Sequence, residues 1–215
     1  MPERAIPGQP VAMTPNRRLF LSLIAGLACA DAAWAQGLPV RVAIDTAAGT
    51  ILVELFPDKA PVTCANFLRY VDEKRFNGAV FYRTMRMTMG PDGPAYGLIQ
   101  GGTNGDPARR RPPIAHEPTT QTGLRHVDGT ISMARFAPGS ATGEFFICVG
   151  EASYLDANPA LDGDNLGYAA FGQVVEGMGA VRAIHAMPTS PTAGEGVMKG
   201  QMLEPKVVMT AVRRV

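Results

Sequence analysis

Apolar residues recur at every second position in two segments separated by a short turn. Residues 40–44 and 51–55 each place Val, Ile or Leu at alternate positions, and Ala47-Ala48-Gly49 between them is typical of a turn. Side chains two residues apart share one face of a strand, so the pattern predicts a β-hairpin with one buried face.

The period then changes to three or four residues. Pro61 suits the first turn of a helix, and the apolar positions recur at helical steps up to about Lys74. A second, shorter helical pattern covers roughly residues 177–187, with its apolar residues on one side. We therefore expect two helices, each with an apolar face to bury.

The other apolar runs are short. We expect strands at residues 79–83, 98–101, 130–134, 145–149, 171–175 and 206–212. Many short strands, two helices and no regular βαβ alternation favour an antiparallel barrel or sandwich whose openings are capped by the helices. The linking segments 87–97, 103–128 and 156–167 are rich in Gly, Pro and Asp, and ordered loops of that length are usually functional.

Two adjacent aromatic residues open the strand predicted at residues 145–149. Neighbouring side chains of a strand point to opposite faces, so Phe145 and Phe146 cannot both enter one core. The pattern alone leaves open which ring is inside.

The first 35 residues have the pattern of an export signal. Arg17-Arg18 precede an apolar run over residues 19–30, and Ala33-Trp34-Ala35 has the small-x-small pattern of a signal-peptidase site. The apolar run is shorter than the roughly 20 residues that span a bilayer, which favours a removed signal over a membrane anchor.

We expect cleavage after Ala35, which leaves residues 36–215 as one domain in the periplasm, with full secretion as an alternative. Residues 16–21 fit a twin-arginine signal and a general secretory signal equally well. Lipidation at Cys29 fits the flanking residues poorly, and Met13 is an alternative start to Met1.

Composition and charge exclude several classes of function. The chain is 46% hydrophobic, and residues 36–215 hold equal numbers of basic and acidic residues. The balance argues against a nucleic-acid or membrane role for the processed protein, and we interpret Arg109-Arg110-Arg111 as a solvated loop. Cys64 and Cys148 each lie in an apolar pattern, so we favour free thiols over a disulfide.

The sequence contains no P-loop, dinucleotide-binding, zinc or nucleophile-elbow motif, and we expect no cofactor or metal. No Ser, Cys or carboxylate pair is set up with a base in the sequence, which disfavours a secreted hydrolase.

Five separated motifs carry a family resemblance. They are, in order, Phe81-Tyr82-Arg83, Leu98-Ile99-Gln100-Gly101-Gly102, Ser132-Met133-Ala134-Arg135, Glu144-Phe145-Phe146-Ile147 and Gly167-Tyr168-Ala169-Ala170-Phe171-Gly172. Their order and spacing resemble a bacterial cyclophilin, the peptidyl-prolyl cis-trans isomerase family, over essentially all of residues 40–215. The resemblance implies a mainly β fold, a closed eight-stranded antiparallel barrel capped by two α-helices, with the proline site on the outer wall.

The resemblance also assigns residues to roles. Arg83 and Gln100 would be catalytic, Gln100 orienting Arg83. Phe145 would enter the core, and Phe146 would form the floor of the proline pocket. The implied substrate-binding residues are Phe81, Leu98, Met133, Ala134, Arg135, Glu144, Phe146, Tyr154, Leu155 and Tyr168. Singly these residues also fit plain structural roles, such as a surface ion pair for Arg83, and it is the joint pattern that favours a site.

The chemistry of this reaction suits Arg83. Rotation about the X-Pro bond breaks no covalent bond, and its uncatalysed barrier is about 20 kcal/mol. Twisting the amide localises a lone pair on the prolyl nitrogen, which a fixed, permanently charged hydrogen-bond donor stabilises.

Three positions depart from the family pattern. Gly97 replaces an aromatic residue, with Tyr96 beside it, after an insertion around residues 87–95. Glu144 replaces a more usual Gln and could pair with Arg83, orienting it but reducing its charge. Tyr154 replaces a frequent Trp, which makes tight cyclosporin binding doubtful.

We therefore predict an isomerase that assists the folding of exported proteins, acting as a monomer on proline-containing extended polypeptides. The rival interpretation is a catalytically weak module on the same fold that binds proline peptides without turning them over.

Overall fold

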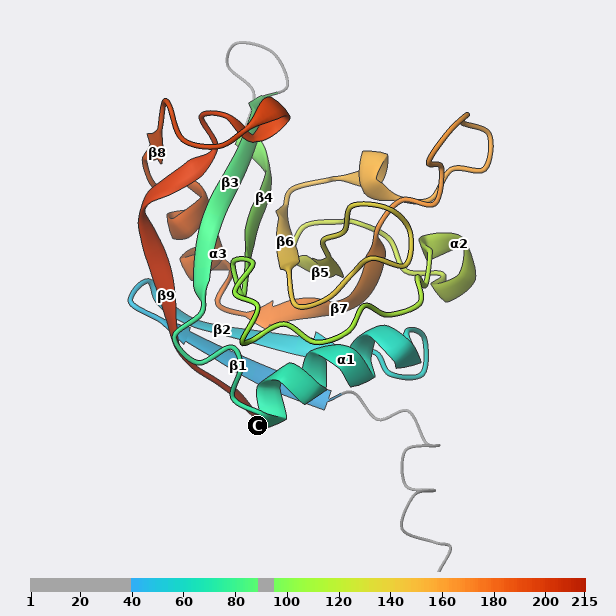
Figure 1. Ribbon diagram of the computed structural model, residues 1–215, viewed down its shortest axis with the longest axis horizontal. Coiled ribbons are helices and arrows are strands. Elements are labelled where there is room, and N and C mark those ends of the chain that lie inside the picture. Colours follow the sequence, from blue (N-terminus) through green and yellow to red (C-terminus); the bar gives the residue numbers. More distant parts are fainter. Residues whose placement is uncertain (1–39, 89–94) are drawn as a thin grey trace, which may run out of the picture. The chain divides into compact units, whose positions relative to one another are not determined.

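Eight antiparallel strands close into a barrel (Figure 1). The computed structural model describes residues 40–88 and 95–215. The barrel strands are β1 (Val40–Thr46), β2 (Gly49–Leu55), β3 (Val80–Thr88), β4 (Ala95–Gly102), β5 (Thr130–Met133), β6 (Phe145–Val149), β7 (Ala169–Glu176) and β9 (Met202–Arg214). They follow the order β1-β2-β7-β5-β6-β4-β3-β9, and β9 pairs back with β1 to close the wall. The two-residue strand β8 (Thr189–Ser190) adds to β9. The predicted barrel is confirmed.

Two helices bury their apolar faces in the barrel core. They are α1 (Pro61–Asp72) and α3 (Met178–His185), close to the predicted ranges. Phe67 of α1 packs against Phe145 and Phe171 with ring centroids 5.3 and 5.2 Å away, and Val181 of α3 is fully buried in the same cluster. The carboxylate of Glu117 accepts hydrogen bonds from the first free N–H groups of α1, where a negative charge is favoured.

Three further helical turns are too short to leave a periodic pattern in the sequence. They are the one-turn helix α2 (Thr119–Thr122) and the 3-10 turns η2 (Ser153–Leu155) and η3 (Gly196–Met198). Within the described residues, no helix has the length and apolar content that crossing a membrane requires.

The two adjacent phenylalanines lie on opposite faces of the wall. Phe145 is fully buried inside the barrel, where its ring meets the edges or faces of Phe67, Phe76 and Phe81 at 5.3 to 5.8 Å. Phe146 belongs to a separate cluster on the outer face. The expected phase of β6 is therefore confirmed.

A bulge in β3 turns Arg83 outward. Phe81 is fully buried inside the barrel, and Arg83, two residues later, would face the same way in a regular strand. The pairing of β3 with both neighbours, β4 and β9, shifts register between Phe81 and Arg83. Relative to β4, Tyr82 is the extra residue, and it reverses the alternation, so Arg83 reaches the outer face.

Segment 87–97 was expected as a linking loop. Its described residues, 87–88 and 95–97, are strand instead. β3 continues to Thr88 and β4 begins at Ala95, with Met87 opposite Tyr96. Residues 89–94 lie outside the described part of the chain. Gly97 has φ +147°, and a Cβ there would overlap the backbone of Met85. The hairpin therefore has no room for a side chain at position 97, and alternation puts Tyr96 on the outer face with Leu98.

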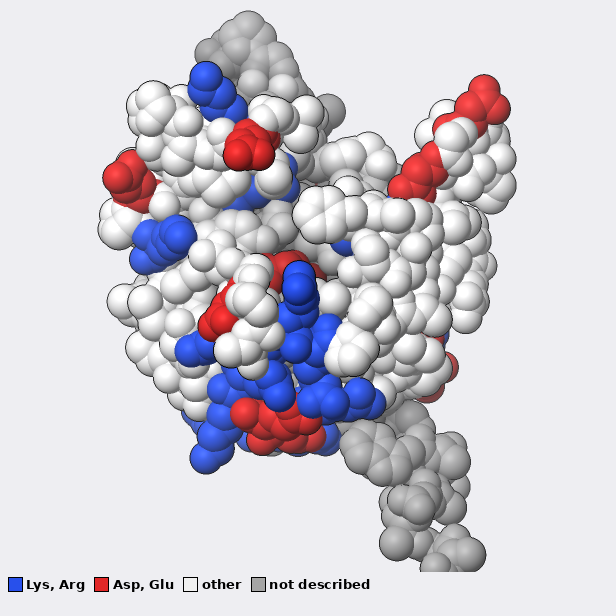
Figure 2. Space-filling model, viewed as in Figure 1, with Lys and Arg blue, Asp and Glu red and all other residues white. Residues whose placement is uncertain are grey.

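Arg109 and Arg111 lie in the expected loop, and their side chains hold it against the turn that follows α1. Arg109 donates from Nη1 to the carbonyl oxygens of Arg75 and Asn77 at 3.1 and 2.7 Å, and Arg111 pairs with Glu73. Figure 2 shows basic side chains gathered around acidic ones on this face. The segment is a loop, as expected, but its cations are only partly solvated, because carbonyl groups in the turn after α1 and the carboxylate of Glu73 accept from them.

Cys64 and Cys148 are free thiols, as expected. Cys64 lies in the barrel core and Cys148 in the outer cluster, and burial raises the pKa of each thiol to about 12. The predicted signal segment, residues 1–35, lies outside the described residues.

Candidate functional site

Outward side chains of three neighbouring strands form two aligned rows on the barrel wall. In the first row Arg83 of β3 pairs with Gln100 of β4, and Gln100 pairs with Phe146 of β6. The second row is formed by Met85, Leu98 and Cys148. Adjacent strands lie about 4.8 Å apart, so a cation and an aromatic ring share one small area of the wall.

Arg83 is held by two amide oxygens. Its Nη1 donates to Oε1 of Gln100 at 2.7 Å, while Nε and Nη2 both donate to Oε1 of Gln201 at 2.9 and 2.7 Å. Among the described residues no carboxylate pairs with Arg83. Burial lowers the pKa of Arg83, but an arginine stays protonated at neutral pH. The site therefore contains a fixed cation whose charge is not neutralised.

An apolar surface lies beside this cation, which we call the outer apolar cluster. Its buried members are Leu98, Phe146, Cys148, Ala152 and Leu155, with Met85, Ala134 and Tyr168 packed against them. The ring of Tyr168 meets that of Phe146 edge-on, with centroids 5.4 Å apart. The structure thus brings four other predicted site residues together with Phe146: Leu98, Ala134, Leu155 and Tyr168.

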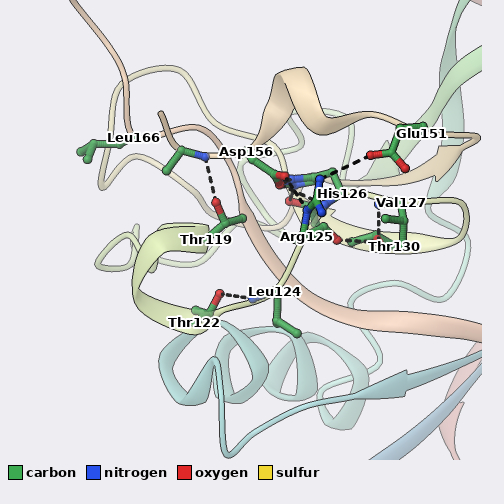
Figure 3. Close-up of polar contacts among 12 residues, drawn as sticks. Thr119, Thr122, Leu124, Arg125, His126, Val127, Thr130, Glu151, Asp156 and Leu166 are labelled. Carbon is green, nitrogen blue, oxygen red and sulfur yellow. Dashed lines mark hydrogen bonds and ion pairs between the residues drawn. The ribbon is translucent and has the colours of Figure 1, made fainter. Parts of the chain in front are cut away.

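A polar trio, of which His126 and Ser132 are fully buried, supports the ring of Phe146 from beneath. His126 stacks on Phe146 at 5.9 Å, its Nδ1 lies 2.6 Å from Oδ1 of Asp156, and its Nε2 lies 2.9 Å from Oγ of Ser132. Asp156 also lies 3.7 Å from Nε of Arg125, and Figure 3 shows the three side chains close together. Burial lowers the pKa of His126, so the ring is neutral, donates from Nδ1 to Asp156 and accepts from Ser132.

This trio corrects the expectation that no serine is set up with a base. Ser132, His126 and Asp156 have the order of contacts of a hydrolytic triad. Ser132 and His126 are fully buried, however, so no substrate can reach the hydroxyl group. The arrangement can hold the floor of the outer apolar cluster but cannot act as a nucleophile.

Arg135 is committed to structure through its side chain. Nη1 and Nη2 donate to the two carboxylate oxygens of Asp164 at 2.6 and 2.9 Å, Nε donates to the carbonyl of Gly167 at 2.9 Å, and the guanidinium lies 5.1 Å from the ring centroid of Tyr168. The side chain is thus almost fully buried in these contacts, so only the backbone of Arg135 remains available to a peptide.

The rim beside Tyr154 is hollowed. Tyr154 is half exposed, and burial raises the pKa of its hydroxyl group to about 12. A cavity of about 160 Å³ lies against it, lined by Arg135, Tyr154, Asp156, Asn158, Leu161, Asp164, Asn165, Gly167 and Tyr168. The segment predicted as a functional loop, residues 156–167, thus borders the outer apolar cluster.

Two predicted substrate-binding residues do not face this surface. Phe81 and Met133 are buried inside the barrel core, so the prediction that their side chains contact substrate is wrong. For Met133 the reason is strand alternation, because Ser132 is the outward residue beside it. For Phe81 the reason is the bulge that separates its face from that of Arg83.

Glu144 does not pair with Arg83, contrary to one interpretation of the sequence. Its Oε1 accepts from Oγ1 of Thr103 at 2.7 Å, and its buried Oε2 has no hydrogen-bond partner of standard geometry among the residues that the structure describes. Burial and the nearby charge of Glu144 raise the pKa of Tyr82. The carboxylate of Glu144 therefore affects Thr103 and Tyr82 and does not reduce the charge of Arg83.

We expect Glu144→Gln to keep the catalytic activity and to raise the free energy of unfolding by about 1 kcal/mol. A neutral amide keeps an acceptor for Thr103 and removes a partly buried negative charge. Urea denaturation with the isomerase assay tests this expectation. A large loss of activity would instead assign the carboxylate a positive role.

The fold and site together define a closed β-barrel protein with a cation beside an apolar surface on its outer wall. Residues 40–212 match the family described as cyclophilin type peptidyl-prolyl cis-trans isomerase/CLD. The chain belongs to this family.

Curated relatives with similar sequences support the same family assignment. A peptidyl-prolyl cis-trans isomerase of Acinetobacter baylyi is 37% identical over 69% of this chain and 73% of its own. Isomerase A of Dickeya dadantii is 34% identical over 76% and 81%, and isomerase B of Escherichia coli is 36% identical over 69% and 85%.

Solved structures share the fold at lower identity. A cyclophilin of Cryptosporidium parvum aligns with a TM-score of 0.63 at 19% identity, over 83% of this chain and 98% of its own. The same protein solved in the presence of the dipeptide Ala-Pro aligns at 0.62 over 80% and 97%, also at 19% identity.

Sequence reasoning missed three contributors to the site: Gln201, Met85 and the polar trio under Phe146. Gln201 lies 118 positions from Arg83, in a segment that matched no motif. Met85 is two residues after Arg83 in β3, so the two side chains share a face. Strand alternation beyond the bulge could therefore have identified Met85 as a site residue.

Proposed function

We propose that this protein is a peptidyl-prolyl cis-trans isomerase that acts on X-Pro bonds of extended polypeptides. The observation that carries the proposal is the un-neutralised guanidinium of Arg83 in the same register row as Phe146, separated only by Gln100. The presence of Ala-Pro in the solved relative supports a proline peptide as the ligand.

The geometry fits a reaction that needs no covalent catalysis. The outer apolar cluster would hold the proline ring against Phe146, and the guanidinium would donate to the prolyl nitrogen as the amide twists. Gln100 fixes the direction of the fork, because its Oε1 accepts from Arg83 and its Nε2 donates to the hydroxyl of Tyr82 at 2.8 Å. The surface thereby favours the twisted amide over both planar forms.

Two-dimensional exchange NMR on a short Ala-Pro peptide tests the proposal. The wild-type protein should produce cis-trans exchange peaks at catalytic concentration, whereas the peptide alone exchanges over tens to hundreds of seconds. Proline-limited refolding of a second protein should accelerate in parallel. Binding shifts without exchange peaks would contradict the proposal and favour the rival, a proline-peptide-binding module.

We further propose that the protein is exported to the periplasm and assists folding there as a monomer. The basic pair, apolar run and Ala33-Trp34-Ala35 site support export. Proline isomerisation is slow enough to limit folding, which gives such an enzyme a role among exported proteins. Sequencing the N-terminus of the protein recovered from the periplasm tests this, and a start other than Gln36 would contradict the cleavage site.

A further inference from the structure

Gln201 makes more hydrogen bonds to the guanidinium of Arg83 than any other residue described. Its Oε1 accepts from Nε and from Nη2, while Gln100 accepts only from Nη1. The backbone of Gln201 also accepts from the N–H of Thr84 at 2.9 Å, so it is attached to β3 directly beside Arg83.

Hydrogen bonds at both the oxygen and the nitrogen determine the orientation of the Gln201 side-chain amide. A guanidinium has only donors, so the oxygen of the amide must face Arg83 and the nitrogen must face away. That nitrogen donates to the carbonyl of Val197 at 2.9 Å. The side chain is thus fixed between the guanidinium and its own loop.

The loop before β9 is compact and holds Gln201 in place. The N–H of Gly200 donates to the carbonyl of Ala193 at 2.9 Å, and the N–H of Gln201 to that of Met198 at 3.1 Å. Gly194 has φ +92°, and a Cβ there would overlap the carbonyl group of Met198. The loop therefore closes on itself and presents one amide oxygen to Arg83.

We propose that Gln201 is a positioning residue that aims the guanidinium of Arg83 while leaving its positive charge intact. The proposal deepens the proposed isomerase function and rests on it. A carboxylate at position 201 would also orient the guanidinium but would neutralise its charge. An apolar side chain would leave Nε and Nη2 of Arg83 without an acceptor, so the guanidinium could rotate. A neutral amide meets both requirements.

Two substitutions separate orientation from charge. We expect Gln201→Met, which keeps the length and removes the acceptor, to lower kcat/KM about tenfold. We expect Gln201→Glu to lower kcat/KM at least as much although it keeps the acceptor, because the charge of the fork falls. The affinity for the proline peptide, measured by NMR titration, should change little in Gln201→Met. The exposed Gln121 of α2 provides the matched controls, Gln121→Met and Gln121→Glu, which should match wild type.

A double-mutant cycle separates positioning from a general structural role. If Gln201 acts through Arg83, Gln201→Met should cause no further loss in an Arg83→Ala background. Wild-type activity of both Gln201 variants, or an additive loss in that background, would overturn the proposal.

The Nε–H resonance of Arg83 gives a readout that does not depend on activity. We expect it to be shifted and protected from exchange with water in wild type, and to move toward free-arginine values in Gln201→Met. An unchanged resonance would refute the positioning role even if the isomerase function holds. Absence of catalysis by wild type, together with a resonance that responds, would refute only the function.

Discussion

Replacing Arg83 with alanine should lower kcat/KM for cis-trans exchange by about a hundred- to a thousandfold, with the fold intact. One preorganised donor aimed at a developing charge contributes roughly 2.7–4 kcal/mol to the activation free energy. Arg83 fits that description because two amides fix it and no carboxylate among the described residues neutralises it. Exchange NMR on a proline peptide measures the loss directly.

Arg83→Lys separates charge from geometry in the same experiment. A lysine keeps the charge as a mobile point, so we expect an activity between those of wild type and Arg83→Ala. The control is Arg41→Ala, which removes an exposed ion pair with Glu54 at the hairpin of β1 and β2. If Arg83→Ala exchanged the peptide at the wild-type rate while still folded, the proposed mechanism would be wrong.

The barrel was predictable because its signals are local. Alternation along β1, β2 and β6 and the helical period of α1 are each visible within a dozen residues. The phase of Phe145 and Phe146 needed the family resemblance, because the two phases are equivalent in the pattern. The position of the outer site could therefore be predicted only once the family was identified.

The details of the site were not predictable because they depend on contacts distant in sequence. Tyr82 forms a bulge only when both neighbouring strands are in place, and without it Arg83 would face inward. Gln201 meets Arg83 only after β9 closes the barrel. The glutamate at position 144 suggested an ion pair with Arg83, but its carboxylate accepts from Thr103 and Gly105 instead.

Phe146→Leu should weaken the binding of a proline peptide about tenfold, at a modest cost in stability of about 1 kcal/mol. Leucine keeps an apolar side chain but loses the flat face against which a proline ring would pack. It also loses the stacking on His126 and the edge contact with Tyr168. NMR titration with the peptide and urea denaturation measure the two effects separately.

The neighbouring substitution supplies the matched control across the barrel wall. Phe145→Leu removes edge-on contacts with Phe67, Phe76 and Phe81, so it should lower the free energy of unfolding by about 2 kcal/mol. Its folded fraction should bind the peptide with wild-type affinity, because Phe145 does not reach the outer surface. If Phe145→Leu weakened binding and Phe146→Leu did not, the floor of the pocket would have been assigned to the wrong ring.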